Sequence, residues 1–282
     1  MKPVVSIMAQ GGMGAATAQR LTEHGVEVRT VTAGRSAASA ERAKKAGMKS
    51  VSEDELIAAD FILSIVPPAE AIPLAKQLAP LLMKAPKKPV YVDLNAVNPD
   101  TAMMVEMIIS PTGARFVDGG IIGMPPRPGY SPVYYVSGEH ARSVEALAEY
   151  GLKIGVLDLP GCAASALKMS YAGITKGLIG VATAMILASE RAGIAPALYA
   201  ELAASQPNLV AGFRKSIPDM FGKAGRWVAE MEEIARFAGG EGAAERGLYD
   251  GLARLYQRIG GDNAGKQTEI AALRDFFPPE TK

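Results

Sequence analysis

The stretch from Lys2 to Leu21 constrains the fold of this chain more than any other. Val4 to Met8 is an apolar, β-branched run, and a glycine-rich turn separates it from a helix-forming segment. A strand, a glycine turn and a helix in this order indicate a dinucleotide site, because the backbone can approach a pyrophosphate and the helix offers free amides to it. The turn consists of Ala9, Gln10, Gly11, Gly12, Met13 and Gly14.

The turn departs from the usual Gly-x-Gly-x-x-Gly pattern at its first position. Ala9 stands where glycine is usual, so the pattern is Ala-x-Gly-x-x-Gly. We expect this change to be tolerated because alanine is the next smallest residue. The same residues also suit an ordinary tight turn, so the rest of the chain decides between the two interpretations.

Composition places the chain among globular proteins of one or two domains. It has 282 residues, of which 49% are hydrophobic and 21% are charged. The net charge of +1 gives no electrostatic reason to expect nucleic acid or an anionic membrane as a partner. The single cysteine, Cys162, excludes an intrachain disulfide and suits a reducing compartment.

The sequence does not predict export or membrane insertion. The first apolar run is only a few residues long and leads into glycines, unlike a signal peptide. Gly177 to Ser189, the longest uncharged apolar segment, is shorter than the ~20 residues that span a bilayer. We therefore expect a soluble cytoplasmic protein.

The first half of the chain alternates strand-like and helix-like segments. Continuous apolar runs separated by helical segments favour a mostly parallel sheet with both faces covered, as in a Rossmann-type α/β domain. Ligands of such sheets lie at the carboxyl ends of the strands, which places the Ala9–Gly14 turn, Thr32–Ser36, Val66–Pro68 and Asn95 around one crevice. The expected strands are Val4–Met8, Val26–Thr32, Met48–Val51, Phe61–Val66, Val90–Leu94, Arg115–Val117, Pro132–Val136 and Ile154–Leu157.

The end of the second strand indicates which cofactor binds. An NAD site usually has Asp or Glu there to bond the ribose hydroxyls, but this chain has no carboxylate between Val28 and Ala40. A guanidinium beside a hydroxyl residue suits the 2′-phosphate of NADP. We therefore predict NADP (NADPH), with Arg35 as a solvated loop residue the alternative. The cofactor residues expected in this segment are Thr32, Gly34, Arg35 and Ser36.

The second half of the chain is helical. Pro160-Gly161 ends the strand pattern, and from Ala163 to Ile270 the periodicity is almost only that of helices. We expect an NADP-binding Rossmann domain over residues 1–160 and an all-helical domain for substrate binding and dimerisation over residues 161–282. The later helices are expected at Pro196–Ala204, Asn208–Arg214, Arg226–Ala238 and Ala243–Arg258.

A long helix at the start of the second half has two patterned faces. Its apolar residues lie on one face and are Leu167, Ile174, Leu178 and Met185. Small residues at helical spacing permit close approach of another helix, and these are Gly173, Gly177 and Gly180. A helix of this length has more apolar surface than one short domain covers, so we expect a homodimer.

A Rossmann domain with Gly-x-Met-Gly in its turn, joined through a long helix to an all-helical domain, resembles the β-hydroxyacid dehydrogenase family. That family includes 3-hydroxyisobutyrate dehydrogenase and the nucleotide domain of phosphogluconate dehydrogenase. The segments that match are Gly11–Gly14, Val66-Pro67, Asp93–Asn95, the substrate-loop segment Phe116–Gly123, and Gly161 with Lys168. In addition, Arg226 to Ala235 is similar to a subgroup with a distinct C-terminal helical domain.

The resemblance implies roles for individual residues. Val66, Pro67 and Asn95 would lie near the cofactor. Asn95 would also help to position the substrate, together with Gly120, Ile122, Gly123 and Tyr171. Two departures separate the chain from the family pattern: Ile122 replaces a serine that bonds the substrate, and Ala172 replaces an asparagine. Arg127, in a proline-rich loop, is a further candidate to clamp an anionic substrate or is an exposed loop residue.

Lys168 is the candidate catalytic residue. Alcohol oxidation needs a base for the hydroxyl proton, and a lysine with a lowered pKa can serve. Lys168 lies at the family's lysine position, although a lysine among apolar neighbours can equally be a snorkelling interface residue. We predict an NADP-dependent oxidoreductase acting on a small hydroxy acid or related polar alcohol. The alternatives are an imine reductase on the same architecture and a non-catalytic NADP(H)-binding sensor.

The other reactive residue types suggest no further chemistry. The two histidines and the cysteine are too dispersed for a metal site. His24 precedes a glycine that ends a helix, so a helix-terminal role is expected. His140 is expected to be solvated, and Cys162 to pack at the boundary between the domains.

Overall fold

A computed structural model describes residues 2–279 of the chain. The chain divides into two compact units, Met1–Met169 and Ser170–Lys282, which we call the sheet unit and the helical unit. The division lies inside one long helix, α6 (Ala163–Arg191), and so comes later than the boundary expected at residue 160. The reason is that the first two turns of α6 are attached to the sheet.

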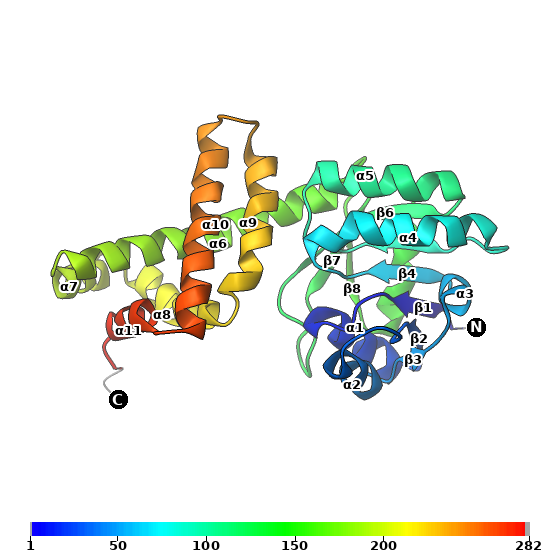
Figure 1. Ribbon diagram of the computed structural model, residues 1–282, viewed down its shortest axis with the longest axis horizontal. Helices are drawn as coiled ribbons and strands as arrows, with labels where there is room; N and C mark the ends of the chain where they lie inside the picture. The colour runs from blue at the N-terminus through cyan, green and yellow to red at the C-terminus, as the bar shows by residue number, and fades with distance from the viewer. Residues whose placement is uncertain (1, 280–282) are drawn as a thin grey trace. The chain divides into compact units, whose positions relative to one another are not determined.

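The sheet unit contains one eight-stranded sheet in the order β3-β2-β1-β4-β5-β6-β7-β8 (Figure 1). Neighbouring strands are parallel except for β6 and β7, which are antiparallel. This order confirms the Rossmann-type fold, since the chain reverses its direction of winding between β1 and β4. The strands are β1 Val4–Ile7, β2 Glu27–Thr30, β3 Lys49–Ser50, β4 Phe61–Ser64, β5 Val90–Asp93, β6 Arg115–Ile122, β7 Val133–Ser137 and β8 Lys153–Val156.

Successive residues of the central strands enter two separate hydrophobic cores. Leu63, Val92 and Val117 pack in the core that also holds Ala18 and Leu21 of α1. Their strand neighbours Ile62, Tyr91 and Phe116 pack in the core formed with α4 and α5. Because side chains alternate between the faces of a strand, a sheet covered on both faces needs continuous apolar runs. The helices are α1 Gly12–Glu23, α2 Ala37–Lys45, α3 Glu53–Ile57, α4 Ala71–Lys84 and α5 Pro99–Ile109, with 3₁₀ turns at Pro68–Glu70, Ser110–Thr112 and Ala141–Tyr150.

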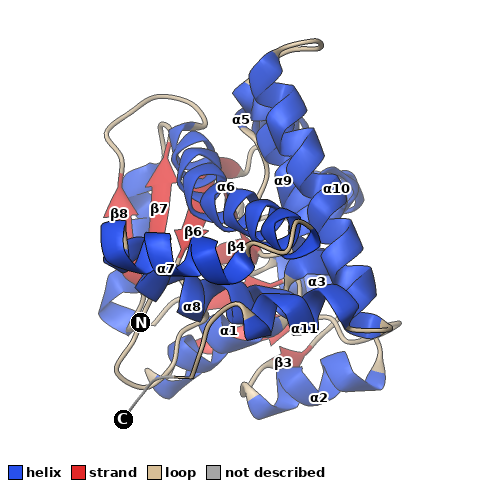
Figure 2. Ribbon diagram, turned by 90° about the vertical axis from the view of Figure 1, so that its left-hand side faces the viewer, coloured by secondary structure: helices blue, strands red, loops and turns tan. Residues whose placement is uncertain are grey.

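The helical unit consists of the rest of α6 and five further helices. α9 and α10 lie side by side in both ribbon views (Figures 1 and 2). The helices of this unit after α6 are α7 Ala195–Ser205, α8 Pro207–Phe221, α9 Ala224–Ala238, α10 Ala244–Ala264 and α11 Thr268–Asp275. The sequence predicted the first four of these, with α8 and α10 ending earlier than they do, but not α11.

The small-residue face of α6 packs within the chain. A Cβ added to Gly173 would lie 3.0 Å from the Tyr249 hydroxyl, and one added to Gly180 would lie 2.5 Å from a methyl group of Leu252. These glycines therefore let α10 approach α6 closely. They do not by themselves indicate a second copy of the chain.

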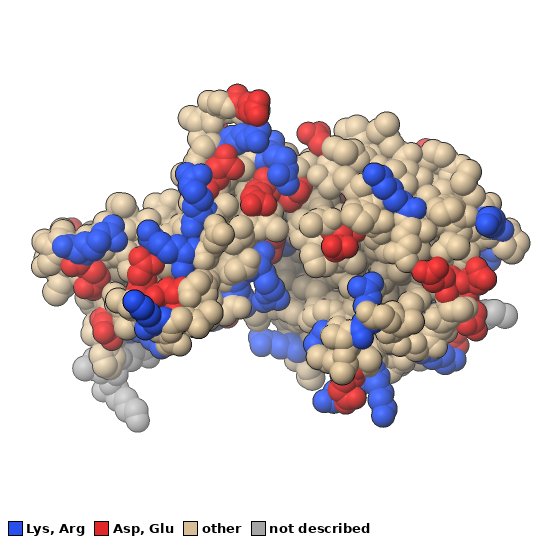
Figure 3. All heavy atoms as spheres, in the orientation of Figure 1, with Lys and Arg blue, Asp and Glu red and all other residues tan. Residues whose placement is uncertain are grey.

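The apolar stripe on α6 is largely exposed, with Ile174 71%, Leu178 47% and Met185 58% accessible. With 29 residues and a mean hydropathy of 1.5 over its best window, α6 is long and apolar enough to cross a membrane, which the sequence had not led us to expect. However, 44% of that window is buried in the protein, and core helices of soluble proteins pass the same test. On the face shown in Figure 3, basic and acidic side chains are interspersed.

Replacing Gly14 by alanine is expected to lower the free energy of unfolding by at least about 2 kcal/mol. The new methyl group would overlap the main-chain oxygen of Ala9, which cannot turn away as a side chain can. Gly12→Ala is the matched control, because nothing lies within 4 Å of its added Cβ. Urea unfolding followed by circular dichroism would measure both, and equal stabilities of the two variants would contradict this packing.

Candidate functional site

The glycine turn leaves open space at the start of α1. Gly11 is the N-cap residue, no side chain caps the helix, and its first turn holds no acidic residue. Cβ atoms added to Gly11 or Gly12 would meet nothing within 4 Å, whereas Gly14 packs on the chain itself. Uncapped amides at a helix N-terminus with free space before them suit a pyrophosphate. The turn therefore fits the dinucleotide that its sequence predicts.

The other residues of the turn attach it to the sheet. Gln10 is buried, and its Nε2 donates to Thr30 Oγ1 and to the main-chain oxygen of Val31 at 3.1 Å. Met13 packs against the core beneath α1. Ala9 has a negative φ, so the unusual alanine occupies a backbone conformation that does not require glycine.

The segment after β2 contains the predicted cofactor residues. Ser36 caps α2 by accepting from the Ser39 amide at 3.3 Å, and Gly34 has a φ of +73° that favours glycine. Thr32 Oγ1 bonds to Ser50 Oγ at 2.6 Å, and Arg35 is exposed. Sequence reasoning missed Arg42, whose Nε donates to the main-chain oxygen of Gln10 at 2.6 Å. Only its position on α2, seven residues after Arg35, hinted at a second guanidinium near the turn.

Asn95 holds two loops together at the carboxyl edge of the sheet. It is 2% accessible, and its Oδ1 accepts from the Val66 amide at 2.7 Å while its Nδ2 donates to Ser64 Oγ at 2.9 Å. The amide group thus fixes the course of the chain into Pro67. Asn95 therefore positions the loop after β4. The contacts with cofactor and substrate expected for Asn95 stay predictions.

Lys168 is attached to β6 beside a close helix–strand contact. Its Nζ donates to the main-chain oxygen of Ile121 at 2.8 Å. A Cβ added to Gly120 would lie 2.9 Å from the Cβ of Lys168 and 3.1 Å from the oxygen of Ala164, so α6 can approach β6 only over glycine. Since β6 is parallel to β5, β4 and β1, Ile121 lies toward the same edge of the sheet as the glycine turn.

The carboxylate of Asp118 anchors the start of α6. Its Oδ2 accepts from Ser137 Oγ at 2.8 Å and from the Ser165 amide at 2.9 Å, and its Oδ1 accepts from Ser165 Oγ at 2.5 Å. Asp118 and Ile121 on β6 therefore hold Ser165 and Lys168 on α6, with the same spacing on both elements. Burial raises the pKa of Asp118, while its hydrogen bonds lower it.

The remaining substrate candidates lie in different surroundings. The segment expected as a substrate loop at Gly120 and Ile122 is part of β6, because the strand continues to Ile122 instead of ending at Val117. Gly123 follows with a φ of +132°. The main-chain oxygen of Arg127 accepts from Arg20 at 2.9 Å, which places it beside the last turn of α1 and not at the glycine turn. Tyr171 is 49% accessible and lies in the helical unit.

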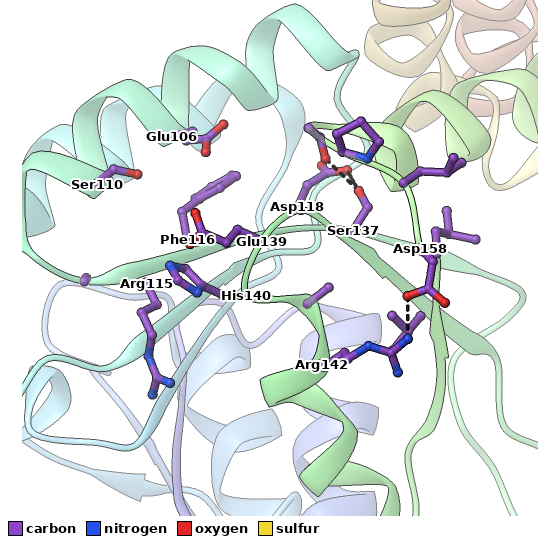
Figure 4. A pocket seen from close by; sticks show the side chains of 18 of the residues that line it. Glu106, Ser110, Arg115, Phe116, Asp118, Ser137, Glu139, His140, Arg142 and Asp158 are labelled. Atoms are coloured by element: carbon purple, nitrogen blue, oxygen red, sulfur yellow. Dashed lines mark hydrogen bonds and ion pairs between the residues drawn. The ribbon is translucent and has the colours of Figure 1, made fainter.

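A cavity of about 910 Å³ lies at the other edge of the sheet. It is lined by the end of α5, the start of β6 and the ends of β7 and β8, and β7 and β8 run opposite to β6. Figure 4 shows Arg142 paired with Asp158 in its wall, and Asp118 bonded to Ser137 in the same wall. The distance between Arg142 Nη2 and Asp158 Oδ1 is 2.6 Å. The cavity is thus separate from the glycine turn, and its charges are mixed.

No group of three or more possible metal ligands occurs among residues 2–279. His24 ends α1 as its C-cap residue, and its Nδ1 lies 2.8 Å from the Arg20 oxygen. His140 lies in the wall of the cavity described above. Burial raises the pKa of Cys162 to about 12, so its thiol stays protonated and is a poor nucleophile.

Fold and site together define a dinucleotide-binding protein of the doubly wound α/β class. A family model described as the NAD binding domain of 6-phosphogluconate dehydrogenase matches residues 5–153. The chain belongs to this family, which confirms the resemblance to the β-hydroxyacid dehydrogenases. Residues 189–259 match a second model, described as a domain of unknown function (DUF1932), so the C-terminal helices are those of a distinct subgroup.

Among curated proteins, the chain is 30% identical over 171 residues to an uncharacterized 28.5 kDa protein of Methanothermus fervidus. The match spans 60% of this chain and 64% of that relative, slightly less than two thirds of its length.

Solved structures of similar fold share less of the sequence. One is the conserved protein MTH1747 of unknown function, for which similarity to 3-hydroxyacid dehydrogenases is described (24% identity, TM-score 0.71, 95% of this chain and 98% of that one). Another is the 3-hydroxyisobutyrate dehydrogenase of Mycobacterium tuberculosis with L-serine (18%, 0.71, 97% and 100%). The imine reductase of Myxococcus stipitatus with NADP⁺ is also similar (16%, 0.59, 97% and 99%). At these identities the likeness establishes the fold.

Asp93 is a buried acid beside this site. It faces Asp118 across neighbouring strands, and its Oδ1 accepts from the Asn95 amide at 2.9 Å. Its Oδ2 has no hydrogen-bond partner within the described residues. Burial, together with the nearby Asp118, raises the pKa of Asp93 to about 7 against the lowering effect of the hydrogen bond from the Asn95 amide.

Replacing Asp93 by asparagine is expected to flatten the fall of stability with pH. The folded protein keeps a proton up to about pH 7 that the unfolded chain releases near pH 4, so the free energy of unfolding falls as pH rises between these values. The slope is at most about 1.4 kcal/mol per pH unit. Asparagine stays neutral and keeps the oxygen that accepts from Asn95. Urea unfolding at about pH 5 and about pH 8 measures the slope.

Glu241→Gln is the control for this measurement, because Glu241 is an exposed carboxylate in a turn. It should keep the slope of the wild type. If Asp93→Asn keeps that slope as well, Asp93 is ionised in the folded protein over this range.

Proposed function

We propose that this protein is an NADP-dependent oxidoreductase that transfers hydride between the nicotinamide and a small hydroxy acid or related polar alcohol. Lys168 would serve as the general acid and base. The observation that carries the proposal is the hydrogen bond of 2.8 Å between Lys168 Nζ and the main-chain oxygen of Ile121. This bond places the amino group toward the carboxyl edge of the parallel strands, the edge at which the glycine turn also lies. Family membership supports a dehydrogenase or reductase with a nicotinamide cofactor.

The residues after β2 support NADP in preference to NAD. No carboxylate occurs between Val28 and Ala40, so nothing in this segment repels a 2′-phosphate. Arg35 is exposed on a turn that ends in the capping hydroxyl of Ser36. A planar guanidinium and a hydroxyl donate to phosphate oxygens, while an NAD site uses an acidic acceptor for the ribose hydroxyls.

In the oxidation direction, the neutral amine of Lys168 accepts the hydroxyl proton of the substrate. The nicotinamide of a dinucleotide held at the glycine turn would supply the acceptor for the hydride from the same carbon. The alcohol would then become a carbonyl, with one proton left on Lys168. The bond to Ile121 restricts the amino group to the end of β6, and correct placement of a base raises the rate. In the reverse direction the ammonium of Lys168 returns the proton to the carbonyl oxygen.

The polar contacts to the substrate differ from the family pattern. Ile122 and Ala172 offer no hydroxyl or amide where the resemblance implies them. We therefore propose the class of substrate by its reacting group alone. Gly120, Ile122, Gly123, Tyr171 and Arg127 remain predicted substrate contacts.

The alternatives differ in what they require of Lys168. Imine reductases share the fold at TM-scores of 0.59 and 0.60. The family resemblance implies that an imine reductase usually has another residue at the lysine position, so Lys168 favours the dehydrogenase. A sensor would bind NADPH and turn over nothing.

A purified sample tests the proposal in two steps. Thermal-shift measurements should give a larger rise in Tm with NADPH than with NADH, because only the former has the 2′-phosphate. A panel of hydroxy acids, alcohols and cyclic imines then identifies a substrate, for which Lys168→Ala should lower kcat by about 10²-fold or more. Lys153→Ala, an exposed lysine on β8, is the control and should keep kcat.

Each contrary result points to a different alternative. A preference for NADH would remove the argument from Arg35. Turnover of imines alone would favour the imine reductase. Tight binding of NADPH without turnover would favour the sensor, and an unchanged kcat of Lys168→Ala would refute the lysine mechanism.

We also propose a homodimer, on the basis of the apolar surface of α6. Ile174, Leu178, Val181 and Met185 form an exposed apolar stripe along α6, and such a surface is costly in a monomer. A monomer mass in light scattering would exclude it.

A further inference from the structure

Arg42 joins two parts of the cofactor site that lie 32 residues apart in the chain. Its Nε donates to the main-chain oxygen of Gln10 at 2.6 Å, and its Nη2 donates to Ser39 Oγ at 2.9 Å. Ser39 lies in the first turn of α2, three residues after the capping Ser36. One guanidinium therefore connects the start of α2 with the residue before Gly11.

Gln10 is held from two directions. Its side chain is bound to β2 through Thr30 and Val31, and Thr30 Oγ1 in turn donates to the oxygen of Ile7 at 2.7 Å. Its main-chain oxygen is bound to Arg42. The side chain thus fixes where Gln10 lies, and Arg42 fixes how its carbonyl is turned.

The orientation of the Gln10 carbonyl determines the direction of the Gly11 N–H. The chain contains no cis peptide bond among residues 2–279, and in a planar trans peptide the C=O and the next N–H point in opposite directions. By holding the oxygen of Gln10, Arg42 sets the direction of the Gly11 N–H. That N–H has no hydrogen-bond partner within the described residues, and Gly11 has free space around it. Glycine has no side chain to restrict its own backbone, so the restriction comes from Arg42.

Arg35 differs from Arg42 in its contacts, although both residues are exposed. Arg35 follows Gly34, which has a φ of +73°, and the Arg35 side chain makes no hydrogen bond within residues 2–279, whereas Arg42 makes two. Arg35 is therefore suited to contact the 2′-phosphate directly. Arg42 already uses two of its donor nitrogens inside the protein.

We propose that Arg42 is a positioning residue for the whole dinucleotide: it orients the Gln10–Gly11 peptide toward the pyrophosphate and couples this loop to the start of α2. The inference rests on the proposed cofactor site. The two arginines then have different roles: Arg42 supports binding of the pyrophosphate, which NADPH and NADH share, and Arg35 binds only the 2′-phosphate of NADPH.

Isothermal titration of the full chain with NADPH and with NADH tests this separation. We expect Arg42→Ala to raise both dissociation constants by similar factors of about tenfold, the effect of losing a charge-assisted hydrogen bond. Arg42→Lys keeps the charge but not the fork of two donors, and should also weaken both cofactors. Arg35→Ala should weaken NADPH by about tenfold and leave NADH within about twofold.

Two controls separate positioning from charge and from folding. Lys45→Ala removes one exposed charge from the same helix and should leave both dissociation constants within about twofold. The stoichiometry of the titration reports the folded fraction, so a merely unstable variant would show fewer sites at an unchanged dissociation constant.

Two results would overturn the inference while leaving the proposed function intact. Arg42→Ala with unchanged binding of both cofactors would show that the loop keeps its shape without the arginine. A loss confined to NADPH would show that Arg42 is a phosphate ligand. A wild-type protein that binds neither cofactor would overturn both the inference and the proposed function.

Discussion

The attachment of α6 to β6 through Asp118 is the interaction on which the candidate site depends. A carboxylate is costly to bury, and here three donated hydrogen bonds offset that cost. Two of the donors belong to Ser165, so the carboxylate also accepts from a main-chain amide in the first turn of α6. Lys168 follows about one turn later on α6 and donates to the main-chain oxygen of Ile121, three residues after Asp118 on β6. A substitution of Asp118 would therefore change the position of Lys168 through the attachment of α6 to β6.

The same principle of indirect placement recurs along the carboxyl edge of the sheet. Asn95 shapes the loop after β4 from inside the protein, and Arg42 shapes the loop after β1 from the neighbouring helix. The surfaces that would meet a ligand are then left to glycines and main-chain groups. Such a site is built before its ligand arrives, which lowers the entropy lost on binding.

Much of the fold was predictable because it follows from local patterns. Short apolar runs separated by helical segments predicted all eight strands, and the Ala9–Gly14 turn predicted the order of strand, turn and helix. The predicted end of β6 at Val117 was wrong, because the glycines at 119 and 120 weaken the strand pattern in the sequence. In the structure, Gly120 lets α6 approach the strand. The site was predicted in outline: Lys168 and the glycine turn lie toward one sheet edge. The roles of Asp118 and Arg42 were not predicted, since each acts through a partner far away in the chain. The raised pKa of Asp93 was not predicted because it results from burial in the folded sheet.

The sequence by itself determined the Rossmann-type sheet, the change to helices after Gly161, the family, and the absence of an acidic residue after β2. These features depend on which residue types stand a few positions apart, and the periodicity of strands and helices is a pattern over the same short distances. Only the tertiary structure decided which residues hold the site in place. Asn95 proved to be buried, Arg127 to lie beside the far end of α1, and the glycines of α6 to contact α10. Hydrogen bonds and close packing between distant segments leave no periodic trace in a sequence, because they depend on the three-dimensional meeting of single side chains.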